Sequence, residues 1–230
     1  MSTKMEYSTP YIAPTLTVDV VLFQIINAEL CVLLIKRANE PYKGSWALPG
    51  GYCAEGETTI DALRRIVITK AGVDITLDTA HVEQLYTFDT VARDPRGHAV
   101  SVTYMACGLN VACRPSATNE TEFFPLGSLP ETAYDHSDII AYAHARLQAK
   151  ITYTNAVYAL LPKLFTLTEL QSSYEAILMR PLDKRNFRKK FLQLELISGT
   201  NQKRADGAHR PAQLFTFKQQ KLQTLTRSFD

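Results

Sequence analysis

Apolar and polar residues alternate over the first 150 residues in patterns that predict a sheet with helices. Leu16–Ile26 and Leu30–Arg37 are rich in β-branched and apolar residues, and the short polar break between them predicts a β-hairpin. A stripe at helical spacing, made by Ile60, Leu63, Val67 and Ala71, predicts a helix after Thr58. Further strands are predicted at Val82–Thr90, at Ala99–Leu109 and from Phe123, and a further helix at Ala133–Ala149.

After Lys150 the pattern changes to short helices. Helices are predicted at Asn155–Leu164, at Thr166–Met179 with Thr168 and Gln171 in capping-box spacing, and from Asp183 to Ile197. A basic loop and the alternating segment Gln213–Phe217 follow, which is the outline of a winged helix-turn-helix. We therefore expect an N-terminal arm at residues 1–13, an α/β domain with a mixed sheet at 14–150 and a winged-helix domain at 151–230.

Composition is that of an ordinary globular protein, with 46% hydrophobic and 21% charged residues. The N-terminus has no signal-peptide pattern and no apolar run reaches membrane-spanning length, so we expect a cytoplasmic protein without a membrane partner. Four separated cysteines contain no C-x-x-C pair, which fits a reducing compartment and no zinc site. His98, His136 and His144 lack metal-ligand spacing and are predicted to lie on the surface or in helix caps.

The net charge of +2 conceals a strong asymmetry. Residues 1–150 carry 12 Lys and Arg against 17 Asp and Glu, a net charge of −5. Residues 151–230 carry 13 against 6, a net charge of +7. A basic C-terminal domain beside an acidic one points to an anionic polymer as partner of the second domain.

The predicted helix after Asp183 divides into an apolar and a basic side. Phe187, Phe191 and Leu194 have helical spacing and are predicted to face the core. The other side is the arrangement that a recognition helix uses in the major groove of double-stranded DNA, although a merely solvated helix face would also be basic. The DNA-contacting residues predicted on this helix are Lys184, Arg185, Asn186, Arg188 and Lys189. Those predicted in the wing are Lys203, Arg204, His209 and Arg210.

The segment Ser45–Val73 resembles the signature of Nudix hydrolases. That signature is Gly, five residues, Glu, seven residues, and then Arg-Glu-apolar-x-Glu-Glu-x-Gly-apolar, and Gly51, Glu57, Arg65 and Gly72 match it without insertion. The resemblance implies an α/β/α sandwich, consistent with the predicted elements. The three glutamates that should follow Arg65 are replaced by Ile66, Thr69 and Lys70.

These replacements remove the chemistry of the signature. A pyrophosphatase needs converging carboxylates to hold a divalent cation, and the ammonium of Lys70 repels such an ion. Glu55, Glu57 and Asp61 remain, but they lie before or within the first helical turn, where acids also serve as helix-start residues. We therefore expect no metal, no required cofactor and no catalysis by the usual Nudix route.

A Nudix-like domain followed by a basic winged helix resembles the NrtR family, the Nudix-related transcriptional regulators of NAD metabolism. This resemblance covers nearly the whole chain and implies a homodimeric repressor of NAD biosynthesis or salvage genes that binds a palindromic operator. It also implies that ADP-ribose, bound in the old substrate pocket, acts as the effector that releases DNA. The effector-binding residues predicted on this basis are Arg37, Gly50, Gly51, Glu57, Arg64, Phe88 and Asp89.

Two alternatives stay open at this point. The first is a Nudix hydrolase of ADP-ribose or a related nucleotide that takes displaced metal ligands from Glu55, Glu57 and Asp61. The second is a regulator of the same architecture that responds to a sugar. A panel of ligands tested for thermal stabilisation distinguishes them, because a ligand stabilises only the state that binds it.

Overall fold

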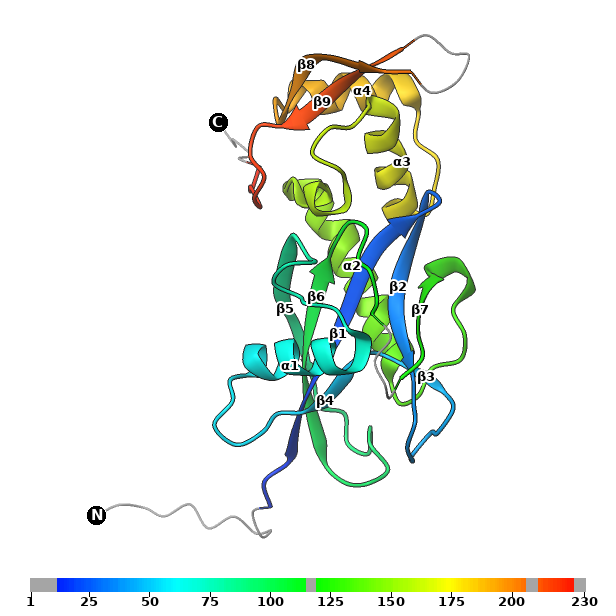
Figure 1. The fold of residues 1–230 in the computed structure, drawn as a ribbon, viewed down its shortest axis with the longest axis vertical. Helices are drawn as coiled ribbons and strands as arrows, with labels where there is room; N and C mark the ends of the chain where they lie inside the picture. The colour runs from blue at the N-terminus through cyan, green and yellow to red at the C-terminus, as the bar shows by residue number, and fades with distance from the viewer. Residues whose placement is uncertain (1–11, 115–118, 206–210, 226–230) are drawn as a thin grey trace, which may run out of the picture.

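The computed structural model describes residues 12–114, 119–205 and 211–225. The molecule is elongated, with a sheet domain at one end and a smaller domain of helices and a hairpin at the other (Figure 1). The predicted arm at residues 1–13 lies almost wholly outside the described residues, as do His209 and Arg210 of the predicted wing.

In the described part of the chain, the first domain contains one seven-stranded mixed sheet. Strands β1 and β6 pair in parallel, and the other strand pairs are antiparallel. The predicted hairpin is confirmed as β1 and β2, with Ile26 opposite Glu29 next to the turn. The strands are β1 (Thr15–Ile26), β2 (Glu29–Lys36), β3 (Trp46–Ala47), β4 (Gly50–Tyr52), β5 (His81–Phe88), β6 (Ala99–Cys107) and β7 (Thr121–Pro125).

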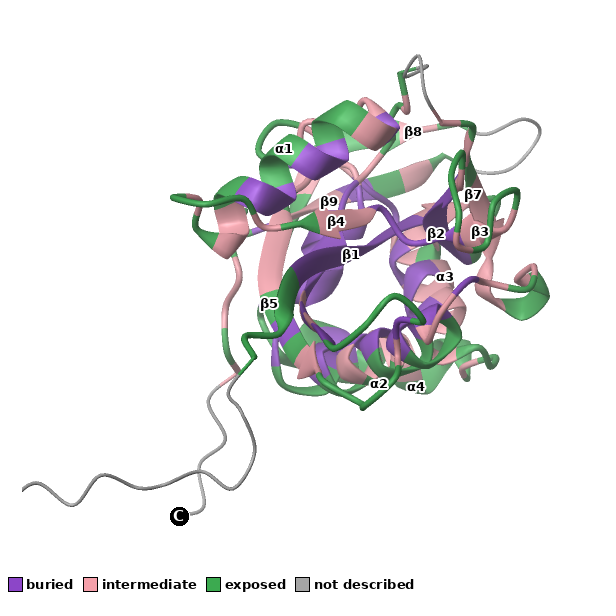
Figure 2. Ribbon diagram, turned by 90° about the horizontal axis from the view of Figure 1, so that it is seen from below, coloured by how far each residue is buried: buried purple, intermediate pink, exposed green. Residues whose placement is uncertain are grey.

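Helices cover both faces of this sheet. The alternation of side chains along β1 directs Val20 and Leu22 toward α1 (Thr59–Ala71), and Val21 and Phe23 toward α2 (His136–Tyr153). Figure 2 shows the buried residues gathered between these layers. The α/β/α sandwich with a mixed sheet is therefore confirmed.

The C-terminal domain is the predicted winged helix. It consists of the 3-10 helix η2 (Ala156–Leu160), α3 (Leu167–Leu178), α4 (Lys184–Gln193) and the hairpin of β8 (Ile197–Arg204) and β9 (Ala212–Phe217). Tyr174 of α3 packs against Phe187 and Phe191 of α4, with ring centroids 5.2 and 5.6 Å away. These aromatic contacts hold α4 against α3.

Two local predictions in this domain are wrong. The capping box of α3 is formed by Thr166 and Glu169 rather than by Thr168 and Gln171, because the helix begins at Leu167. Helix α4 ends at Gln193, earlier than predicted, and Leu194 is 45% exposed at its C-terminus. The chain then enters β8, so Leu196 takes the buried position that was expected for Leu194.

The two domains share one core and are joined by the continuous helix α2. Helix α2 runs to Tyr153, across the boundary expected after residue 150. From α2, His144 and Gln148 both bind the carbonyl oxygen of Ile177 in α3, at 2.6 and 3.0 Å. A change in the sheet domain that moved α2 would therefore move α3 with it.

The last turns of α2 are tied to β5 by a buried ion pair, and its removal should be measurable. Lys150 donates to Glu83, and His81 lies 3.3 Å from the same carboxylate. Burial raises the pKa of Glu83, but the hydrogen bonds from His81 and Lys150 outweigh it and lower the pKa from 4.5 to about 2. The stability contributed by Glu83 is therefore fully present above pH 4.5 and is lost as the pH falls toward 2.

Glu83→Gln should lower the free energy of unfolding at pH 7 by about 2 kcal/mol, the scale of one hydrogen bond to a charged group. It should also flatten the loss of stability between pH 4.5 and 2, measured by urea denaturation at several pH values. Glu122→Gln is the matched control, because Glu122 is exposed on β7. Equal acid profiles for both variants would contradict this role of Glu83.

Candidate functional site

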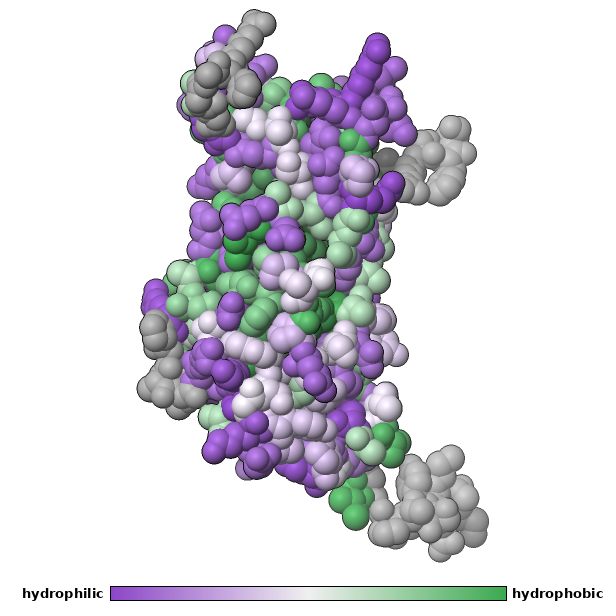
Figure 3. Space-filling view, turned by 90° about the vertical axis from the view of Figure 1, so that its right-hand side faces the viewer, coloured by the Kyte–Doolittle hydropathy of each residue, from purple (hydrophilic) through white to green (hydrophobic). Residues whose placement is uncertain are grey.

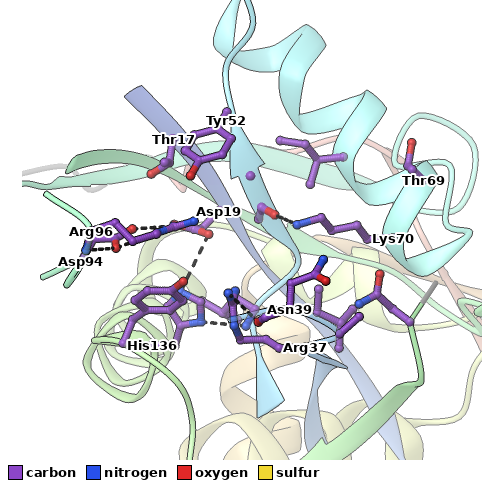
Figure 4. Close-up of a pocket in the computed structure, with 18 of the residues that line it drawn as sticks. Thr17, Asp19, Arg37, Asn39, Tyr52, Thr69, Lys70, Asp94, Arg96 and His136 are labelled. Atoms are coloured by element: carbon purple, nitrogen blue, oxygen red, sulfur yellow. Dashed lines mark hydrogen bonds and ion pairs between the residues drawn. The ribbon is translucent and has the colours of Figure 1, made fainter. Parts of the chain in front are cut away.

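A cavity of about 590 Å³ opens on the sheet domain between the start of α2 and the C-terminal half of α1. Its size lies in the range of small-ligand sites in proteins. Figure 4 shows charged and aromatic side chains from several elements pointing into it. The charged residues, tyrosines and histidine that line it are Asp19, Arg37, Glu40, Tyr52, Arg65, Lys70, Arg93, Asp94, Arg96, Tyr134 and His136.

Two glycines of β4 form one wall of the cavity, and at Gly50 no side chain fits. Gly50 pairs with Asp19 of β1, and a Cβ on Gly50 would lie 1.7 Å from Asp19 Oδ1. A Cβ on Gly51 would lie 3.4 Å from Ile66 and 3.6 Å from Lys70 Nζ. Both glycines, which the sequence predicted to bind the effector, line the cavity.

Gly50→Ala should disturb the cavity and the fold together. Either Asp19 must move or β4 must shift, and strain of this kind in a packed region costs about 1–3 kcal/mol. We expect a lower melting temperature and loss of ligand binding in the same variant. Gly127→Ala is the control, because its Cβ would meet only Met179 Cε at 3.9 Å. A Gly50→Ala variant as stable as the control would contradict the close approach of Asp19.

Lys70 occupies the position where the Nudix signature has a metal-binding glutamate. Its ammonium is half-buried and donates to the carbonyl oxygen of Gly50. Burial lowers the pKa of Lys70, while nearby Asp19 raises it. The residues present do not fit a divalent cation, since Ile66 and Thr69 offer an alkyl group and a hydroxyl that donates to Arg65 O at 2.6 Å.

Two of the three carboxylates that remain near the signature, Glu57 and Asp61, are engaged by neighbouring groups. Glu57 accepts two hydrogen bonds from Arg65, at 2.5 and 2.7 Å, and one from Ala54 N at 3.0 Å. The Arg65 hydrogen bond lowers the pKa of Glu57 from 4.5 to about 2. Thr58 caps α1 by accepting from Asp61 N, as the sequence predicted, and its hydroxyl donates to the Asp61 carboxylate. Among the residues that the structure describes, no three His, Cys, Asp or Glu are grouped so that they could hold a metal ion.

Of the other residues predicted to bind the effector, only Arg37 lines the cavity. Its Nε donates to Pro41 O at 2.7 Å while the guanidinium lies 4.9 Å from the centroid of the Tyr134 ring. Arg64 is exposed and pairs with Asp61 at 3.3 Å. Phe88 packs against Tyr86 and Tyr142 on the outer surface, and Asp89 is exposed. The lining residues of the cavity do not include Glu57, Arg64, Phe88 or Asp89.

Several residues of the cavity were missed from the sequence. Arg93 forms two hydrogen bonds with Asp135, at 2.8 and 2.7 Å, and lies 3.8 Å from Asp19. Arg96 pairs with Asp94 at 2.6 Å and lies 5.5 Å from the ring centroid of Tyr52. Arg93 and Arg96 belong to the loop between β5 and β6, which contains no recognisable motif.

The prediction for His136 was wrong. This residue was predicted on the surface or in a cap, but it is 4% exposed and its Nδ1 accepts from Leu48 N at 2.9 Å. Burial lowers the pKa of His136, although nearby Asp19 and Asp135 raise it. The sequence predicted a helix at Ala133–Ala149 but carried no signal that its first turn lines a cavity.

The second candidate site is the outer face of α4 (Figure 1). Lys184, Arg185, Asn186 and Lys189 are exposed on this helix, as predicted. Arg188 is half-buried and donates to Thr168 at 2.9 Å, so it ties α4 to α3. Hydrophilic side chains gather at this end of the molecule in the view of Figure 3.

The wing is described in part. Lys203 is exposed on β8. Arg204 pairs with Glu169 of α3 at 2.5 Å, which fixes the hairpin against the helices. No helix in the described part of the chain is long and apolar enough to cross a membrane.

Two family models match the chain. Residues 15–143 match the NUDIX domain, and residues 157–217 match the NrtR DNA-binding winged helix domain. The chain is 36% identical over 214 residues to the ADPR responsive transcriptional repressor NtrR of Acinetobacter baylyi, covering 90% of this chain and 83% of that protein. It is 36% identical over 132 residues to the ADP-ribose pyrophosphatase of Methanocaldococcus jannaschii, covering 56% of this chain and 73% of that protein.

Solved structures of Shewanella oneidensis NrtR are also similar. The structure of that protein complexed with a 27mer DNA has a TM-score of 0.75 and 35% identity, covering 88% of this chain and 93% of that one. Its NUDIX domain complexed with ADP ribose has a TM-score of 0.54 and 35% identity, covering 60% and 90% of the two chains. With both domain models matched and a repressor related over most of its length, this chain belongs to the NrtR family of Nudix-related transcriptional regulators.

Proposed function

We propose that this protein is a DNA-binding transcriptional repressor of NAD biosynthesis or salvage genes, and that ADP-ribose bound in the cavity of the sheet domain releases it from DNA. The main observation behind the proposal is that one chain contains both a cavity lined by cationic groups and an exposed basic helix. Relatives support both halves, since one is named as ADPR responsive and another has been crystallised with DNA.

The cavity supports an effector that carries a diphosphate. Arg37 and Lys70 donate to main-chain carbonyl oxygens, so their positive charges can also serve an anionic ligand. Tyr52 and Tyr134 supply aromatic surface beside them, suited to a nucleobase. Of the predicted effector residues we keep Arg37, Gly50 and Gly51 in the proposal, and we add Lys70.

Helix α4 supports contact with the major groove of double-stranded DNA. Lys184, Arg185 and Lys189 project from the packed domain, where arginine can contact guanine edges and lysine the phosphates. We propose that two copies of the chain form a homodimer whose two α4 helices contact the half-sites of a palindrome. The division into a sheet domain and a winged-helix domain, with the boundary moved from residue 150 to the end of α2, and the cytoplasmic localisation remain part of this proposal.

We also propose that the cavity binds its ligand without hydrolysing it. The ammonium of Lys70 lies where a catalytic cation would be needed, and Glu57 is engaged by Arg65. The likeness to a pyrophosphatase keeps a hydrolase as the alternative. Release of AMP from ADP-ribose in the presence of Mg²⁺, at high protein concentration, would favour that alternative.

The test is fluorescence anisotropy on promoter DNA of an NAD-synthesis gene from the same genome. We expect tight binding at low salt, a linear fall of log affinity with log salt concentration, and release of DNA when ADP-ribose is added. DNA binding that ADP-ribose leaves unchanged would overturn the effector. Absence of any specific DNA binding would overturn the repressor.

A further inference from the structure

Two polar atoms face each other inside the cavity without forming a hydrogen bond. Asp19 Oδ1 and His136 Nε2 lie 3.9 Å apart, which is beyond hydrogen-bond distance. Their side chains are 8% and 5% exposed, and both line the cavity (Figure 4). A donor and an acceptor held this close in a buried place mark a position for a third polar group.

The hydrogen bond from Leu48 determines which atom of the histidine is the donor. The N–H of Leu48 donates to Nδ1 of His136, so Nδ1 carries no proton. The neutral ring therefore carries its proton on Nε2. Burial, which lowers the pKa of His136, favours this neutral form. Nε2–H is consequently a donor that faces the carboxylate of Asp19.

The rest of the carboxylate is held by its own partners. Asp19 Oδ2 accepts from Ser101 at 2.5 Å, and Arg93 lies 3.8 Å away but is bound by Asp135. The remaining oxygen, Oδ1, lies over Gly50, in the space that a side chain would fill. The carboxylate is thus fixed in direction, with one oxygen left for the cavity.

We propose that Asp19 Oδ1 and His136 Nε2–H together bind one sugar hydroxyl of the ligand. The hydroxyl donates its proton to Asp19 and accepts from His136, and an oxygen about 2.8 Å from both atoms closes a triangle on their 3.9 Å separation. A phosphate oxygen has no proton to donate and is repelled by the carboxylate. An amine can donate to Asp19 but, when protonated, cannot accept from His136.

This pairing rests on the proposed function and specifies how the ligand lies. Lys70 and Arg37 attract the diphosphate, while the carboxylate of Asp19 excludes it from the neighbouring position. A ligand that joins phosphates to a ribose satisfies both. A nucleotide whose ribose hydroxyl is missing leaves Asp19 and His136 unpaired, which is the basis of strong discrimination at buried polar sites.

The experiment is a cycle of protein and ligand changes measured by isothermal titration calorimetry. The proteins are wild type, Asp19→Asn and His136→Gln. The ligands are ADP-ribose and five analogues that each lack one ribose hydroxyl, which is the 2- or 3-hydroxyl of the adenosine ribose or the 1-, 2- or 3-hydroxyl of the terminal ribose. We expect each variant to weaken ADP-ribose binding about 10- to 100-fold, as for one hydrogen bond to a charged group. We expect one analogue to bind wild type and variants with equal affinity, since it lacks the hydroxyl in question.

Asp78→Asn is the matched control, because Asp78 accepts from Asp74 N outside the cavity. Thermal denaturation checks that each variant is folded. If Asp19→Asn does not fold, the same comparison of ligands is made with His136→Gln alone. If Asp19→Asn and His136→Gln lowered the affinity by the same factor for every analogue, the inference would be overturned and the proposed function would stand. A wild-type protein that fails to bind ADP-ribose would overturn both.

Discussion

Reversing the charges of Arg185 and Lys189 together should abolish binding of the operator and leave the fold intact. Both side chains are exposed on α4 and are not part of the buried core. Each base or phosphate contact of this type contributes about 2 kcal/mol, so losing two of them lowers the affinity about a thousandfold. The repulsion between glutamate and DNA phosphates adds to this loss.

Lys43→Glu is the control for this prediction. It makes one such charge reversal, half of the total change, on an exposed residue of the loop that leads into β3. This loop lies at the opposite end of the molecule from α4 (Figure 1). Anisotropy measured with operator DNA and with unrelated DNA distinguishes loss of sequence-specific binding from loss of non-specific electrostatic binding. If Arg185→Glu with Lys189→Glu bound the operator as tightly as Lys43→Glu, α4 would not be the recognition helix.

The second large effect is expected at Lys70. Lys70→Glu replaces an ammonium in the cavity by a carboxylate beside Asp19, so a diphosphate loses an attraction and meets a repulsion. Together these changes cost about 4 kcal/mol, which lowers the affinity for ADP-ribose about a thousandfold. Lys70→Met removes the charge but keeps the length, and we expect an intermediate loss of about tenfold to a hundredfold.

The metal dependence of binding provides the decisive comparison. If Lys70 supplies the positive charge that a cation supplies in a hydrolase, wild-type affinity measured by calorimetry is the same in Mg²⁺ and in EDTA. Lys163→Glu, an exposed change in the winged-helix domain, should leave this affinity unaltered. Unchanged binding by Lys70→Glu in EDTA would show that Lys70 does not face the ligand.

Together these experiments address how the two ends of the molecule communicate. The effector cavity includes His136 at the start of α2, and the later residues His144 and Gln148 of the same helix hold Ile177 of α3. In the proposed function, effector binding favours a dimer arrangement in which the α4 helices no longer match the operator. Helix α2 is a continuous physical connection between the two sites.

Much of the fold could be predicted from local patterns. The β1–β2 hairpin, the cap of α1 and the aromatic packing of Phe187 and Phe191 follow from residue periodicity and from short-range hydrogen bonds. The end of α4 could not be predicted, because burial of Leu196 rather than Leu194 depends on where β8 pairs with β9. Helix ends of this kind are decided by tertiary packing.

By itself, the sequence determined that the chain joins a Nudix-like domain without its metal-binding glutamates to a basic winged helix, because spacing and charge are properties of the chain. It also predicted Arg37, Gly50 and Gly51, which line the cavity, and the basic residues of α4, of which Lys184, Arg185 and Lys189 are exposed. Only the tertiary structure brought Asp19, Arg93 and His136 together, from a strand, a loop and a helix more than 40 residues apart in sequence. Such a site arises from packing between distant segments, and local sequence patterns do not predict which distant side chains will come into contact.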